Sequence, residues 1–112
     1  MANKRYKLKK EQLKPLATGY DGCIASDYIT VDGRKVGFMY REETDREYDS
    51  GWRFLSGFED DTYLENADNF SVHDVNTIAN YDPDIIPFLD LPAGTEVERK
   101  SPSSPLEVVE GE

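Results

Sequence analysis

Residues 28–40 read YITVDGRKVGFMY, in which two runs rich in β-branched and aromatic residues flank Asp32-Gly33. An Asp-Gly pair suits a two-residue hairpin turn, because both turn positions need a positive φ. Such a turn places Ile29 opposite Val36 across the two strands. The stretch therefore predicts a β-hairpin with one face in the core, which carries Ile29, Val31, Val36, Phe38 and Tyr40.

The neighbouring sequence extends this hairpin into a sheet. Residues 22–26, GCIAS, continue the first strand, and Asp27 would then point into the core, so we expect a break or bulge there. A third strand is predicted at residues 52–56, WRFLS, with its two aromatic side chains on one side, where Trp52 either packs in the core or is exposed to a partner. Residues 94–99, GTEVER, are typical of a last strand.

Three short helices are predicted between the third and the last strand. Residues 60–66 begin with acidic side chains, which the helix dipole favours at that end. Residues 74–81 place apolar side chains on one stripe behind Asp74, a candidate N-cap. Residues 83–89 begin with a proline behind Asp82, a second candidate cap. These elements predict an α+β fold, an antiparallel sheet with a β-hairpin and short helices packed on one face.

The chain has 112 residues and a formal net charge of −10, which suits a single acidic domain. Its charge is uneven, because residues 1–14 hold six basic side chains and one acid. We therefore divide the chain into a basic N-terminal arm over residues 1–19, a single α+β domain over residues 20–100, and a flexible C-terminal tail over residues 101–112. The tail begins with the turn-forming sequence SPSSP.

The composition also bears on the compartment. The one cysteine, Cys23, cannot form a disulfide within the chain, and small secreted domains usually carry paired cysteines. The apolar runs are too short for a membrane span, and the basic start is not followed by an apolar stretch as in a signal peptide. We expect a cytoplasmic protein that does not contact membranes.

Six sequence blocks together resemble one protein family. They are GCIASD at 22–27, VGFMYREE at 36–43, DSGWRF at 49–54, DNF at 68–70, NTI at 76–78 and NYDPDIIPFL at 80–89. They resemble the bacterial immunity protein thirty-three-like domain family, formerly a domain of unknown function. The resemblance covers roughly residues 20–100. It implies an α+β fold and the neutralisation of a cognate toxin by binding it, and it supplies no catalytic residues.

The residues themselves predict no catalytic, cofactor-binding or metal site. A nucleophilic site would need Cys23 or a serine to meet His73, the one histidine, in space, and no nucleophile motif is present. One cysteine and one histidine are too few for zinc, and no stretch matches the calcium loop or a phosphate-binding loop. The abundant carboxylates leave a small carboxylate-based or metal-dependent hydrolase as an open alternative.

A second alternative concerns the arm. Its six cations, with Tyr6 as a stacking group, favour contact with nucleic acid or an anionic membrane. The strongly acidic remainder of the chain opposes this, because it repels a phosphate backbone. Nucleic acid is therefore the less favoured partner.

The acidic stretches predict a surface that binds a protein, which a basic toxin would fit. A protein partner of another kind is a further alternative, and the oligomeric state is left open. Tyr40, Tyr48 and Tyr63 are candidate apolar anchors. The predicted partner-binding residues are Glu42, Glu43, Asp45, Glu47, Asp49, Trp52, Arg53, Glu59, Asp60 and Asp61.

Overall fold

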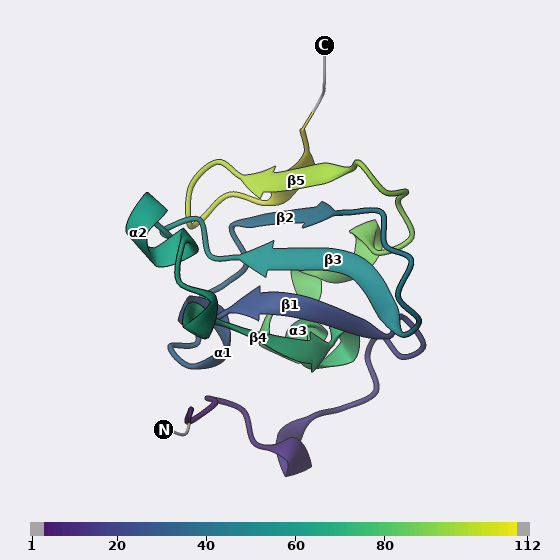
Figure 1. The fold of residues 1–112 in the computed structure, drawn as a ribbon, viewed down its shortest axis with the longest axis horizontal. Coiled ribbons are helices and arrows are strands. Elements are labelled where there is room, and N and C mark those ends of the chain that lie inside the picture. Colours follow the sequence, from purple (N-terminus) through teal and green to yellow (C-terminus); the bar gives the residue numbers. More distant parts are fainter. Residues whose placement is uncertain (1–3, 110–112) are drawn as a thin grey trace.

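The sheet has six strands in the order β4-β1-β3-β2-β5-β6 (Figure 1). The computed structural model describes residues 4–109. β1 runs parallel to β3, whereas the other neighbouring strands are antiparallel. The predicted α+β class is confirmed, but the sheet is mixed rather than purely antiparallel. The strands are β1 Gly22–Ser26, β2 Phe38–Arg41, β3 Asp49–Leu55, β4 Phe70–Asp74, β5 Glu96–Arg99 and β6 Leu106–Val108.

The predicted hairpin at Asp32-Gly33 is wrong, because a helix occupies its first strand. α1 (Asp27–Thr30) is capped by Ser26, whose hydroxyl accepts a hydrogen bond from the Tyr28 N–H. Gly33 has φ +81° and its N–H donates to the Ile29 carbonyl, which is the left-handed conformation that ends helices. The positive φ that suits a hairpin turn therefore ends a helix here, and β2 pairs with β3 and β5 instead of β1.

The change of pairing also changes the core face. Ile29 and Val36 are fully buried as predicted, but in β2 it is Met39 that enters the core. Phe38 and Tyr40 point to the opposite face and are half-buried there. The predicted break at Asp27 is confirmed, since β1 ends at Ser26 and α1 begins at Asp27.

The three predicted helices are confirmed. α2 is Asp61–Leu64, α3 is Val75–Tyr81 and η3, a 3₁₀ helix that contains Pro87, is Pro83–Phe88. The side chains of the preceding aspartates each accept a backbone N–H of the first turn: Asp60, Asp74 and Asp82. Two further 3₁₀ turns are η1, Lys10–Gln12, and η2, Ala67–Asn69.

One face of the sheet is covered by α1, α3 and η3, which lie behind it in Figure 1. The core lies between these helices and the sheet, around Trp52 and Phe54 of β3. α2 and η2 lie at one end of the sheet. Among residues 4–109, no helix crosses the rest of the opposite face, which we call the open face.

Both ends of the described chain contact the domain. Leu106–Val108 forms β6 at the edge beside β5, and Leu106 is buried, so part of the segment predicted as a flexible tail belongs to the sheet. In the arm, the Lys4 ammonium lies 3.1 Å from the Asp27 carboxylate and Ala17 is buried. None of the helices within residues 4–109 has the length and apolar composition needed to cross a membrane.

Candidate functional site

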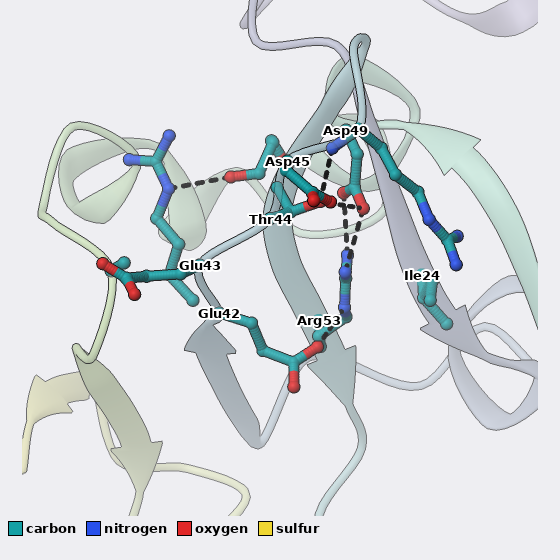
Figure 2. Close-up of a pocket in the computed structure, with 11 residues that line it drawn as sticks. Ile24, Glu42, Glu43, Thr44, Asp45, Asp49 and Arg53 are labelled. Carbon is teal, nitrogen blue, oxygen red and sulfur yellow. Dashed lines mark hydrogen bonds and ion pairs between the residues drawn. The ribbon is translucent and has the colours of Figure 1, made fainter.

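Four predicted partner-binding acids line one wide hollow at the end of the sheet where β2 and β3 are joined (Figure 2). Glu42, Glu43 and Asp45 belong to the connecting loop, and the fourth acid, Asp49, begins β3, whereas Glu47 of the loop lines a smaller hollow beside Val72. The hollow has a volume of about 1050 Å³ and opens broadly to solvent. The loop acids Glu43, Asp45 and Glu47 are exposed and take part in none of the ion pairs formed within residues 4–109.

Arg53 lies at the floor of this hollow and holds two of the acids. Its two terminal nitrogens each lie 3.0 Å from a carboxylate oxygen of Asp49, and its Nε lies 2.9 Å from Glu42 Oε2. The Arg53 side chain is only 11% exposed. Hydrogen bonding by Arg53 holds the pKa of Asp49 at about 2, well below its usual range. Arg53 is therefore largely neutralised from within the protein.

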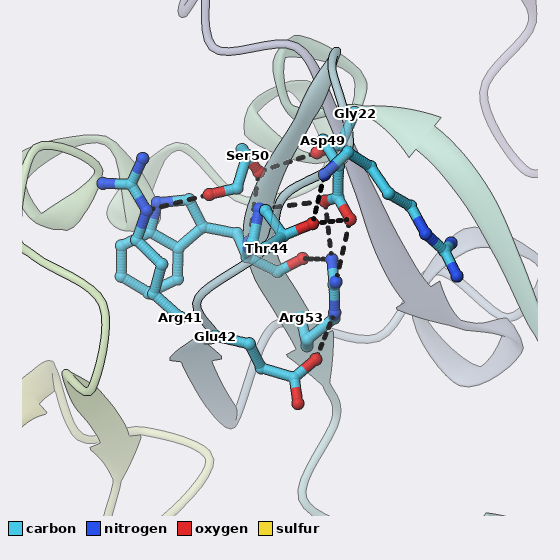
Figure 3. Close-up of polar contacts among 10 residues, drawn as sticks. Gly22, Arg41, Glu42, Thr44, Asp49, Ser50 and Arg53 are labelled. Carbon is cyan, nitrogen blue, oxygen red and sulfur yellow. Dashed lines mark hydrogen bonds and ion pairs between the residues drawn. The ribbon is translucent and has the colours of Figure 1, made fainter.

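An irregularity in β3 supports this arrangement (Figure 3). Gly22 is level with Asp49 while Ile24 is level with Arg53, so β3 contains extra residues at Ser50-Gly51. The Ser50 hydroxyl donates to the Gly22 carbonyl at 2.7 Å and accepts from the Trp52 N–H. Arg41 Nε donates to the Ser50 carbonyl at 2.9 Å. These contacts fix the bulge on both sides.

The other predicted acids lie at the far end of β3, about 20 Å away for a strand of this length. The Glu59 carboxylate accepts from the N–H and hydroxyl of Ser56 and from the Gly57 N–H, so it closes the turn after β3. Asp60 caps α2, and Asp61 is exposed. The predicted acidic residues therefore form two groups rather than one.

Trp52 has no surface to offer a partner. Its side chain is fully buried and its indole N–H donates to the Leu89 carbonyl at 3.1 Å. Arg41 lies over the ring, 5.7 Å from its centroid. Trp52 thus belongs to the core, where it joins η3 to the sheet.

Sequence reasoning named Tyr40 as a candidate apolar anchor but missed the apolar side chains that lie beside it on the open face. Ile24 is level with Val72 of β4 and Arg53 of β3, and Tyr40 is level with Arg53 from the other side. Val72 is 77% exposed. Their alternation with buried residues along each strand indicates a second face of the sheet, but only the strand order shows that these side chains lie together on it.

Cys23 and His73, which the sequence placed in no common motif, are directly opposite one another on β1 and β4. The thiol is 1% exposed and burial raises its pKa, so it lacks the thiolate that a nucleophile needs. Burial also lowers the pKa of His73, whose ring meets Tyr6 edge-on at 4.9 Å. Within residues 4–109 no group of three or more potential metal-ligating side chains comes together.

A family model described as the Immunity protein Imm33 domain matches residues 23–109, from β1 through β6. The resemblance carried by the six sequence blocks is thereby confirmed. No curated protein and no solved structure matches the chain.

Proposed function

Because the chain belongs to the Immunity protein Imm33 domain family, we propose that it neutralises one cognate bacterial toxin by binding it, without catalysis. The match over residues 23–109 is the observation that carries this proposal. The partner is then a protein, and neutralisation consists of covering the surface through which the toxin acts. The chain is proposed to do this in the cytoplasm.

The character of the described residues supports binding rather than chemistry. The one thiol is buried with a raised pKa, and the most perturbed carboxylate, that of Asp49, is held by Arg53. Both are parts of the scaffold. The exposed acids of the β2–β3 loop, in contrast, are free to meet a partner.

The charge of these residues supports a basic toxin. Residues 42–90 contain fourteen acids and two arginines, and one of those arginines, Arg53, is already paired. A protein with this excess of negative charge accelerates association with a cationic partner and repels nucleic acid. Toxins that act on nucleic acid carry such cationic surfaces.

The proposal is tested by affinity capture from the native cells at low salt, with a parallel wash at high salt. We expect one basic protein in near-stoichiometric amount, reduced by the high-salt wash. That protein, expressed in a heterologous bacterial host, should arrest growth, and co-expression of this chain should restore it. A captured protein that is harmless, or growth that stays arrested although the complex forms, contradicts the proposal.

Charge reversal then tests the acidic loop. Asp45→Lys/Glu47→Lys should slow association with the captured toxin about tenfold and weaken its salt dependence. The matched control is Glu11→Lys/Asp32→Lys, which makes the same change of net charge on the arm and at the end of α1. Equal effects of the two double variants would show that only net charge matters and that the loop is not the site.

A further inference from the structure

The open face is apolar along its middle. On β4 and β1 it carries Val72 and Ile24, and on β3 and β2 it carries Leu55 and Tyr40. Val72 is 77% exposed, and at the α2 corner Leu64 is 45% exposed. The opposite face of the same strands is buried under helices, so exposure of these side chains is confined to one side of the sheet.

Hollows run across this face without interruption. The wide hollow of the β2–β3 loop shares Ile24 and Arg53 with a second hollow of about 360 Å³. The second shares Leu55 and Leu64 with a third of about 330 Å³. A fourth, of about 200 Å³, lies between Val72 and Tyr48. Most of the residues that line the second hollow are apolar or aromatic, with Glu42 and Arg53 beside them, and its volume is sufficient for one inserted side chain.

Acidic side chains border the apolar middle. Register places Glu96 level with Tyr40, and Glu98 level with both Phe38 and Glu107, so all three glutamates point to the open face. Like charges directly opposite on neighbouring strands destabilise a sheet, and Glu98 and Glu107 are such a pair. A second group of acids lies in the β2–β3 loop, at the end of the sheet where these two strands are joined. Arg53, which lies near this end of the open face, is already paired with Asp49 and Glu42.

Tyr48, the last residue of the β2–β3 loop, adds an exposed aromatic ring beside the loop acids. It has φ +64°, a conformation that residues with a bulky side chain rarely adopt, and its side chain is 77% exposed. Its carbonyl accepts the Gly22 N–H at 2.7 Å, which anchors the backbone while the ring stays in solvent.

We propose that the open face is the docking surface for a cationic protein, which inserts one apolar side chain into the hollow between Tyr40, Leu55, Leu64 and Phe70. Basic side chains of that partner lie over the glutamates of β5 and β6 and over the acids of the β2–β3 loop. This inference rests on the proposed function in taking the partner to be the toxin. It adds that the binding energy comes from the apolar middle, whereas the acidic borders give orientation and rate.

Charge complementarity identifies the occupant. A second copy of this chain joined through the same face would bring its acidic borders against these, which opposes a symmetric dimer. A nucleic acid meets the same repulsion. A protein with basic side chains around an apolar centre complements both the acidic borders and the apolar middle of the open face.

The experiment uses the full chain and a defined probe, a twelve-residue amphipathic peptide of lysines and leucines with one tryptophan, followed by NMR. We expect the largest shifts at the amides and methyl groups of Ile24, Leu55, Leu64 and Val72, with binding that weakens as salt is added. Shifts confined to the helix-covered side or to the arm, no binding at millimolar peptide, or self-association through the open face would overturn the proposal.

Two matched variant pairs sharpen the test. Val72 lies on the open face at one edge of the sheet, and Val72→Arg should weaken peptide binding about fivefold or more. Val108→Arg introduces the same charge on the other edge strand and should leave peptide binding unchanged. Glu96→Lys/Glu98→Lys should weaken it about tenfold, and Glu11→Lys/Asp32→Lys should do so far less. Equal losses within either pair contradict the proposal. Because the probe is not the toxin, this result is independent of growth rescue, and failure of one does not imply failure of the other.

Discussion

Asp49 and Arg53 lie four residues apart on β3, yet the carboxylate of Asp49 receives both terminal nitrogens of Arg53, each at 3.0 Å. In a regular strand this spacing separates the two Cα atoms by about 13 Å. The bulge at Ser50-Gly51 and the length of the arginine side chain bring the groups together. The pair joins the start of β3 to the floor of the open face and fixes the end of the acidic loop.

The first prediction concerns this pair and pH. Asp49→Asn should lower the free energy of unfolding by about 1 kcal/mol at pH 7. The pKa of Asp49 is lowered to about 2 in the folded protein, against about 3.9 when unfolded, so its contribution is complete above pH 4 and is lost as pH falls towards 2. Urea unfolding followed by Trp52 fluorescence measures this, with Asp45→Asn as the control. A difference between wild type and Asp49→Asn that is constant from pH 7 to pH 2 contradicts it.

The second prediction concerns the bulge itself. Gly51 has φ +88° and a Cβ there would lie 2.2 Å from the Glu42 carbonyl oxygen, whereas Gly94 has φ +96° with no atom within 4 Å. Gly94→Ala should therefore cost only backbone strain, about 1 kcal/mol, and Gly51→Ala about 3 kcal/mol. Thermal and urea unfolding measure both. Equal costs would show that the close approach at Gly51 relaxes without penalty.

The third prediction concerns the buried ion pair of Asp82 and Arg99. Asp82 Oδ2 lies 2.9 Å from Arg99 Nη2 and also accepts the Val36 N–H, and both side chains are at most 5% exposed. Asp82→Asn removes the buried charged partner of the Arg99 guanidinium and should cost about 3 kcal/mol. Asp84→Asn removes the exposed partner at 3.4 Å and should cost less than about 1 kcal/mol. A reversed order of these two losses in urea unfolding would refute this assignment.

The fourth prediction concerns His73 under the arm. Burial lowers the pKa of His73, with Asp27 opposing that shift and Lys4 reinforcing it, and its buried Nε2 has no hydrogen-bond partner among residues 4–109. The unfolded chain therefore takes up a proton first as pH falls below about 6.5, and the protein loses stability there. His73→Phe should abolish this loss.

NMR titration provides the second measurement for His73. Lys4→Met should raise the pKa of His73 towards its ordinary value, because it removes a nearby cation and loosens the arm. A pKa of His73 at or above 6.5 in the wild type would contradict the burial argument.

The helices were predictable because their signals are local. The side chains of Asp60, Asp74 and Asp82 each accept a backbone N–H within three residues, and the cap needs nothing from the rest of the fold. β3 was predictable for a similar reason, since the alternation of Trp52 and Phe54 with outward side chains marks a strand with one buried face.

The partner-binding surface could be predicted only in part from the sequence. Charge along the chain identified the acidic loop, but it did not separate the exposed acids from Glu59, which closes a turn, or from Asp49, which holds Arg53. For Trp52 the sequence left both a core and an interface position open, and the side chain lies in the core. Distinguishing these roles requires the partner atoms, which come from distant parts of the chain.

The sequence by itself determined the acidic character, the short capped helices, the β3 alternation and the family. Only the tertiary structure decided what Asp32-Gly33 does and which strands are neighbours. A glycine with positive φ ends a helix as readily as it turns a hairpin, so local energy leaves the choice open. The parallel pairing of β1 with β3 and the burial of Met39 settle it, because these contacts join residues far apart in the chain.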